Sequence, residues 1–295
     1  MTPEREATIR QGLDAALTAG QTVLVAGGRA LDAVEAAVVA LEDDPLFNAG
    51  RGAVFNDHGF VELDAAIMNG ADRQAGSVTG VRFVRNPVRL ARAVMERTPH
   101  VTLGFASADA FAEAVGLERV DPTYFHTPQR WAALQQELAR MRAGGDAAQA
   151  AEHIKHGTVG AVALDRKGGL AAATSTGGRT AKMAGRIGDT PVFGAGTWAD
   201  ELVAVSCTGH GEVFIRCAAA HSLASRLRYT GQGLIDAADE IVNGELLDMG
   251  GSGGLIAIDW AGNIALPFNC EGMYRASVRA DGQRQIAIYR EDQPH

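Results

Sequence analysis

The run of residues 157–178 constrains this chain more than any other segment, because it holds two strand-forming stretches joined by a tight turn. If Gly168 takes the left-handed position of a three-residue hairpin loop, the register places Thr158 opposite Thr176. Side chains at facing positions of antiparallel strands lie within contact range. The sequence therefore predicts that these two hydroxyl groups meet, although a pair of ordinary strand threonines gives the same pattern.

The elements predicted around this hairpin form two blocks of different character. In the first half, apolar spacing predicts a helical hairpin over the first forty-odd residues, a strand pair at 53–56 and 60–67, and helices at 87–97, 106–115 and 127–142. The small and polar residues 143–157, a linker, a frayed helix or both, divide the two halves. In the second half we expect strands at 158–165, 170–176, 202–207, 255–259, 263–267, 273–279 and 284–289, with helices at about 212–227 and 233–247. Such segregated blocks favour a single layered α+β domain over residues 1–295, not a doubly wound sheet.

Composition narrows the class of partner. Of the 295 residues, 46% are hydrophobic and 21% are charged, which is ordinary globular composition, and the net charge of −8 comes without clusters of either sign. We therefore expect a small-molecule substrate, with no nucleic acid and no membrane as partner, and a cytoplasmic location. The cysteines fit neither a disulfide framework nor a metal site and are predicted to be buried small hydrophobes; they are Cys207, Cys217 and Cys270.

The residue before Thr158 sharpens the hypothesis. Gly157 can adopt backbone conformations closed to other residues, and a self-cleaving chain would place its strain at such a bond. The run 157–165, Gly-Thr-Val-Gly-Ala-Val-Ala-Leu-Asp, resembles that of the plant-type asparaginases and isoaspartyl peptidases, which are N-terminal-nucleophile hydrolases. Further blocks carry the same resemblance in the same order, at 41–55, 62–68, 185–191, 206–212, and 267–269 with 272–275.

The resemblance implies a four-layer αββα sandwich made as an inactive precursor. Cleavage between Gly157 and Thr158 would give an alpha subunit of residues 1–157 and a beta subunit of residues 158–295, assembled as a dimer of heterodimers. The family normally begins with a central strand ending in His-Gly-Gly-Ala-Gly, whereas this sequence begins at the following helix. We expect a start upstream of Met1, with a substitute strand or a weakened relative as alternatives.

The implied catalytic group is the hydroxyl of Thr158, which would become the first residue of its own chain. Its freed α-amine, with a reference pKa of roughly 7.7–8.0, suits a general base near neutral pH. Thr176 would orient or polarise the nucleophile. By resemblance, the Thr208 hydroxyl and the Gly209 amide would bind the oxyanion, in a turn where a strand ends and a helix opens. Taken alone, this turn is also compatible with an ordinary glycine turn.

Substrate recognition follows from the chemistry of an α-amino acid. At the matching family positions, the guanidinium of Arg186 suits an α-carboxylate and the carboxylate of Asp189 can accept from an α-ammonium. Gly209 and Gly211 are also implied to contact substrate, and Asn48 to lie near the nucleophile. Without the resemblance, Arg186 and Asp189 would more often form a surface ion pair.

The loop at 41–51 resembles the sodium-binding loop of the family, and oxygen-only coordination suits a hard cation. The ligands implied are the backbone carbonyls of Leu41, Glu42, Asp44, Phe47, Ala49 and Arg51. No cofactor is expected for catalysis, and a transition metal is not expected, since histidines such as His153, His156 and His210 lack ligand spacing.

These features predict an autoprocessing threonine hydrolase that cleaves isoaspartyl dipeptides and L-asparagine through a β-aspartyl ester and releases L-aspartate. Two alternatives stay open at this point: a glycosylasparaginase-like amidase, and an uncleaved, inactive binding homologue.

Overall fold

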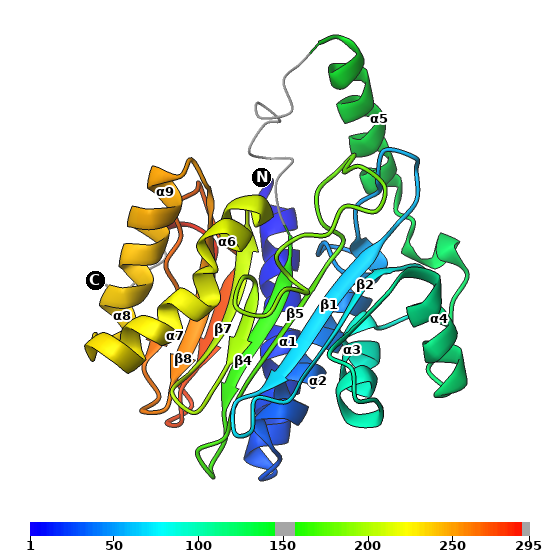
Figure 1. Ribbon diagram of the computed structural model, residues 1–295. Helices are drawn as coiled ribbons and strands as arrows, with labels where there is room; N and C mark the ends of the chain where they lie inside the picture. The colour runs from blue at the N-terminus through cyan, green and yellow to red at the C-terminus, as the bar shows by residue number, and fades with distance from the viewer. Residues whose placement is uncertain (145–156, 291–295) are drawn as a thin grey trace.

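The computed structural model describes residues 1–144 and 157–290 (Figure 1). The predicted linker at 143–157 lies largely outside these residues, as do His153 and His156. Within them, no helix has both the length and the apolar character that a membrane span requires.

The helices and strands lie in two blocks, before and after residues 143–157, as predicted. The helices are α1 (Pro3–Val25), α2 (Ala30–Asp43), α3 (Pro87–Arg97), α4 (Phe105–Ala114), α5 (Pro128–Arg142), α6 (Gly211–Cys217), α7 (Ala219–Thr230), α8 (Leu234–Asp239) and α9 (Leu246–Asp248), with the single turns η1 (Gly50–Gly52) and η2 (Pro122–Phe125) and the π-helical segment η5 (Glu240–Glu245). The strands are β1 (Leu63–Asn69), β2 (Ala75–Val81), β3 (Thr102–Gly104), β4 (Val159–Leu164), β5 (Leu170–Thr176), β6 (Thr197–Ala199), β7 (Val203–Gly209), β8 (Gly253–Asp259), β9 (Ile264–Ala265), β10 (Arg275–Val278) and β11 (Arg284–Ala287). The fold is mixed α+β, as predicted.

A five-stranded sheet in the order β3-β2-β1-β5-β4 carries helices on one face. Helix α2 packs on β4 and β5, α3 packs on β1 and β2, and α1 lies along α2 (Figure 1). The sequence of α2 explains its place, because Leu31, Val34, Val38 and Leu41 recur at helical spacing and are all buried. This confirms the predicted helical hairpin at the start of the chain.

A second sheet, in the order β6-β7-β8-β9, packs against the other face of the first. Between the sheets lies a small apolar cluster that includes Met68, Ala172 and Ala204. A larger cluster fills the space between the second sheet and α6–α8, which cover its outer face. The sheets approach closely at Gly160, where a Cβ would overlap the hydroxyl of Ser206.

The register of the hairpin at 158–176 is confirmed. β4 and β5 are antiparallel, with Val159 opposite Ser175 and Leu164 opposite Leu170. Gly168 has φ +81°, the left-handed conformation that the tight loop needs. The head of the hairpin therefore brings Thr158 next to Thr176.

Two local predictions were wrong, and one long strand was missed. The strand pair at 53–56 and 60–67 reduces to one bridge between Phe55 and Val61, with regular strand starting at Leu63. Strand β2 had not been predicted, because its small residues do not alternate in polarity. The helix predicted at 212–227 breaks at Ala218, which has φ +48°. Of the cysteines, Cys207 and Cys217 are buried, as predicted, and Cys270 is half-buried.

Strand β4 is the last strand of its sheet in the described part of the chain. A cavity of about 580 Å³ runs along its other side, lined by residues 157–164 and, across the gap, by residues 275–278 of β10. Helices α1 and α2 contribute further walls. The nucleophile strand predicted from the sequence thus borders a cavity along its whole length.

Candidate active site

Two hydroxyl groups meet at the head of the hairpin. Thr158 immediately precedes β4, and its Oγ1 lies 2.9 Å from Oγ1 of Thr176 at the end of β5. Thr176 Oγ1 also accepts a hydrogen bond from the N–H of Gly178 at 2.9 Å. Because that N–H can only donate, Thr176 keeps its own proton available for the oxygen of Thr158.

Asn48 ties the loop after α2 to both sides of this hydroxyl pair. Its backbone N–H donates to the carbonyl of Gly157 at 3.1 Å, and its Nδ2 donates to the carbonyl of Gly178 at 2.6 Å. A Cβ at Gly157 would lie 2.5 Å from the Cβ of Asn48, so this close approach requires glycine. The carbonyl of the peptide bond before Thr158 therefore already has a hydrogen-bond donor.

The turn at Thr208 and Gly209 ends β7 just before α6 begins at Gly211, as predicted. Gly209 has φ +149° and faces Gly253 of β8, which has φ +148°. A Cβ on Gly209 would lie 2.7 Å from the Cα of Gly253. Thr208 lines the same cavity as Thr158. This turn is therefore a close backbone contact that opens on the cavity of the hydroxyl pair.

Arg186, Asp189 and Gly211 converge at one point. A Cβ on Gly211 would lie 2.7 Å from Asp189 Oδ1 and 2.9 Å from Arg186 Nη2. On its other side the guanidinium lies next to Gly178, where a Cβ would be 3.4 Å from Arg186 Nη1. The ion pair of Arg186 is with Glu212, so the simple pairing of Arg186 with Asp189 is not what the structure contains.

Asp189 is a buried carboxyl whose Oδ2 has no hydrogen-bond partner among the described residues. Burial raises the pKa of Asp189 to about 7, and the positive charge of Arg186 only partly offsets this. An unsatisfied buried oxygen of this kind is costly unless a donor reaches it. An ammonium group bound beside Arg186 would provide that donor.

The loop at 41–51 curls back on itself between α2 and η1. A Cβ on Gly50 would overlap the carbonyl oxygen of Glu42, and one on Gly52 would overlap that of Phe47. The carbonyl groups of Glu42 and Phe47 thus lie against glycines of this loop, and both are among the oxygen ligands implied for sodium. Within residues 1–144 and 157–290, no group of three or more His, Cys, Asp or Glu side chains is arranged to hold a metal ion.

Sequence reasoning missed three charged residues that surround the predicted ones. Lys182 is buried and donates to the carbonyl of Glu62 at 2.9 Å, and burial lowers its pKa. Asp64 is buried on β1 directly across from Thr176. Glu212 pairs with Arg186. Asp64 and Glu212 lie inside the blocks that carry the family resemblance, and this was the available signal for them.

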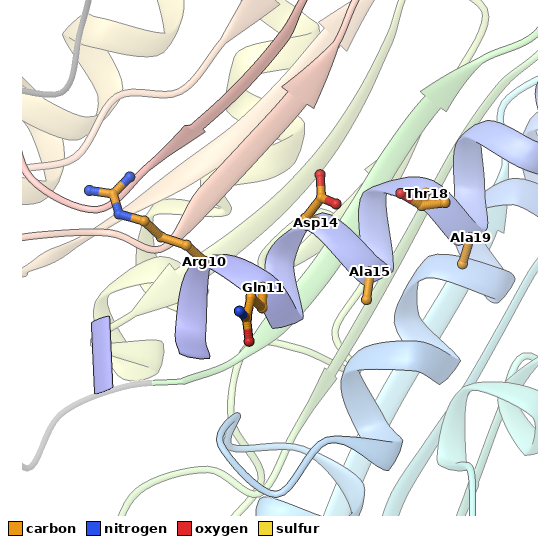
Figure 2. A pocket seen from close by; sticks show the side chains of 6 residues that line it. All are labelled: Arg10, Gln11, Asp14, Ala15, Thr18 and Ala19. Atoms are coloured by element: carbon orange, nitrogen blue, oxygen red, sulfur yellow. The ribbon is translucent and has the colours of Figure 1, made fainter. Parts of the chain in front are cut away.

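A second, open hollow of about 780 Å³ lies on the outer face of α1. Figure 2 shows its lining residues, Arg10, Gln11, Asp14, Ala15, Thr18 and Ala19. No predicted site residue lines this hollow. Hydrogen bonds instead link Thr158 to Thr176 and Thr176 to Gly178, and Arg186 lies next to Gly178.

Comparison with known proteins gives matches along nearly the whole chain. A family model described as "Asparaginase" matches residues 1–288. The isoaspartyl peptidase of Escherichia coli (strain K12) is 50% identical over 297 residues, covering 99% of this chain and 92% of that protein. That of Salmonella typhimurium is 50% identical over 298 residues, covering 99% and 94%. The human isoaspartyl peptidase/L-asparaginase is 41% identical over 290 residues, covering 98% and 92%.

Proposed function

Because this chain belongs to the asparaginase family, we propose that it is an isoaspartyl peptidase/L-asparaginase whose nucleophile is Thr158. It is a hydrolase that releases L-aspartate from isoaspartyl dipeptides and from L-asparagine. The observation that carries the assignment of the nucleophile is the 2.9 Å contact between Thr158 Oγ1 and Thr176 Oγ1, beside a peptide carbonyl held by the N–H of Asn48.

Maturation is the first reaction at this site. Thr158 Oγ1 attacks the carbonyl carbon of Gly157, an ester forms as the bond to the Thr158 nitrogen breaks, and water then hydrolyses the ester. The products are an alpha subunit of residues 1–157 ending in a carboxylate and a beta subunit of residues 158–295 beginning with a free amine. The hydrogen bond from Asn48 N–H to the Gly157 carbonyl supports this step, because it stabilises the charge that develops on that oxygen.

Turnover repeats the same chemistry on the substrate. The α-amine of Thr158 takes the proton of its own hydroxyl, and Oγ1 attacks the side-chain carbonyl of the β-aspartyl group. Ammonia or an amino acid leaves, and water hydrolyses the β-aspartyl ester. We assign the oxyanion to the Thr208 hydroxyl and the Gly209 N–H, which is supported by the cavity that Thr208 shares with Thr158.

The enzyme recognises its substrate by the α-carboxylate and the α-ammonium group. Arg186 binds the α-carboxylate and Asp189 binds the α-ammonium, with Gly209, Gly211 and Asn48 shaping the walls. The guanidinium of Arg186 and the carboxyl of Asp189 both lie against Gly211, which supports this assignment, since the two α-groups of an amino acid are attached to one carbon. The pocket needs glycine at this point because a Cβ there would meet both side chains.

The remaining assignments concern the scaffold. We assign the fold to the four-layer αββα sandwich of N-terminal-nucleophile hydrolases, supported by two facing sheets with helices outside them. A structural sodium ion held by carbonyls of the 41–51 loop, a dimer of heterodimers and a cytoplasmic location likewise stay proposals, and no catalytic step involves the ion.

Intact mass of the purified protein before and after incubation tests the proposal. We expect two chains that separate between Gly157 and Thr158, with a new N-terminal threonine, and hydrolysis of β-aspartyl-leucine once they have formed. Thr158→Ala should stay in one piece and inactive, whereas Thr102→Ala, which removes a hydroxyl on β3 at the opposite edge of the sheet from β4, should behave like the wild type. A full-length chain that still hydrolyses β-aspartyl-leucine would contradict the mechanism.

The names of the similar proteins favour this interpretation over the two alternatives. The first alternative, a glycosylasparaginase, would act on a leaving group that carries a glycan. The uncleaved binding homologue predicts one persistent full-length band in the same mass experiment.

A further inference from the structure

Glu212 holds one edge of the guanidinium that the proposed function assigns to the substrate. Arg186 Nε donates to Glu212 Oε1 and Arg186 Nη2 donates to Glu212 Oε2, both at 3.0 Å. This is a two-bond pairing, which fixes the orientation of an arginine as well as its position. The side chain of Arg186 is 17% exposed and that of Glu212 is 47% exposed.

The third nitrogen of the guanidinium, Nη1, is not used by Glu212. Arg186 Nη1 makes no hydrogen bond to any described residue, and it lies against Gly178 and Gly188. A Cβ on Gly188 would lie 2.8 Å from Nη1. Gly178 N–H donates to Thr176 Oγ1, so Nη1 lies against a residue that is hydrogen-bonded to the hydroxyl pair.

Glu212 also stays ionised in this setting. Burial acts to raise its pKa, but the hydrogen bonds and charge of Arg186 outweigh that effect, so the pKa of Glu212 is lowered. His210 Nε2 lies 3.6 Å from Glu212 Oε2 on the far side. The carboxylate is therefore a permanent partner for Arg186 across the neutral pH range.

We propose that Glu212 is a positioning residue that fixes Arg186 by its Nε–Nη2 edge, so that the Nη1 edge is presented to the α-carboxylate of the substrate. The proposal rests on the proposed function of Arg186. A long arginine side chain without this partner has many rotamers, and ordering it on binding reduces affinity. Glu212 therefore determines how strongly the enzyme prefers substrates with a free α-carboxylate.

The test is steady-state kinetics of the processed enzyme with Glu212→Gln. For β-aspartyl-leucine we expect KM to rise about tenfold, the lower end of what loss of a charge-assisted hydrogen bond causes, with kcat little changed. Self-cleavage should go to completion, since Glu212 does not touch the Gly157–Thr158 bond. Glu212→Asp, which keeps the charge, should recover part of the affinity.

A substrate lacking the α-carboxylate separates positioning from general damage. In this second substrate the α-carboxylate of the aspartyl group of β-aspartyl-leucine is replaced by an amide. The kcat/KM of Glu212→Gln for it should equal that of the wild type, because the ion pair between Arg186 and the α-carboxylate is absent in both. Adding Glu212→Gln to Arg186→Ala should likewise cause no further loss. The matched control is Glu201→Gln, which removes a carboxylate from Arg228 at 2.8 Å on the surface and should leave KM unchanged.

Two results would overturn the proposal: an unchanged KM for β-aspartyl-leucine in Glu212→Gln, or an equal loss with the α-amide substrate. Failure of the proposed function is a different result, because the wild type itself would then not hydrolyse β-aspartyl-leucine.

Discussion

Asp189→Asn isolates the energetic cost of the buried carboxyl in the site. The substitution keeps the shape of the side chain and removes its charge. Burial raises the pKa of Asp189 from the ordinary 3.8 to about 7 in the folded protein. Between these two pH values the folded chain holds a proton on Asp189 that the unfolded chain has lost, so folding is favoured less and less as pH rises.

The size of the effect follows from the shift. A difference of about three pKa units corresponds to about 4 kcal/mol of unfolding free energy. This contribution is complete below about pH 4 and is lost as pH rises through about 7. Asparagine does not titrate, so Asp189→Asn does not lose this stabilisation as pH rises. The unfolding free energy of Asp189→Asn minus that of the wild type should therefore increase by about 4 kcal/mol between pH 4 and pH 8.

Urea unfolding at a series of pH values measures this difference. Both proteins carry Thr158→Ala so that each remains one polypeptide, and Asp281→Asn, at an exposed turn, serves as the control for loss of one surface charge. Titrations common to both proteins cancel in the comparison. If the difference between wild type and Asp189→Asn stays constant to within about 0.5 kcal/mol over this range, the reasoning about burial is wrong.

Further predictions concern catalysis and packing. The kcat/KM for β-aspartyl-leucine should fall below about pH 7, because protonated Asp189 no longer offers a carboxylate to the α-ammonium and the α-amine of Thr158, with a reference pKa of roughly 7.7–8.0, is then protonated as well; a pH–rate profile that is flat there contradicts this. Gly160→Ala should lower the unfolding free energy by about 3 kcal/mol in calorimetry, since its Cβ would overlap Ser206, and Ser206→Gly in the same chain should recover part of it. Asn48→Ala should lower the unfolding free energy by about 2 kcal/mol and reduce kcat, because the two side-chain hydrogen bonds of Asn48 are lost. The chain should still cleave itself, since the backbone N–H remains; a gel that shows uncut protein would contradict this. Sodium chloride should raise the midpoint temperature of thermal unfolding more than tetramethylammonium chloride does at equal ionic strength, because only sodium can bind the 41–51 loop. Equal midpoints in the two salts would contradict the proposed sodium site.

The parts of the structure that could be predicted from sequence are those set by local chemistry. The 158–176 hairpin has a glycine where the turn needs one, so its register and the meeting of Thr158 with Thr176 follow from the residues alone. The buried face of α2 follows from helical spacing in the same way. In both cases the residue pattern that predicts the structure lies within one short stretch of the chain.

The parts that could not be predicted depend on distant contacts. Strand β2 is made of small residues without alternation and is recognisable only from its pairing with β1. Ala218 takes a left-handed conformation that no local rule assigns to alanine. The roles of Lys182 and Glu212 depend on which loops meet them, and an acidic residue opening a helix looks like ordinary end stabilisation.

The facing pair of Gly209 and Gly253 limits how this enzyme can be engineered. A methyl group on either residue would overlap the backbone of the other. Each single substitution is therefore expected to be destabilising, and the double substitution more so. In a saturation-mutagenesis library, both positions should tolerate glycine alone. Directed evolution toward new leaving groups is best confined to positions away from this pair.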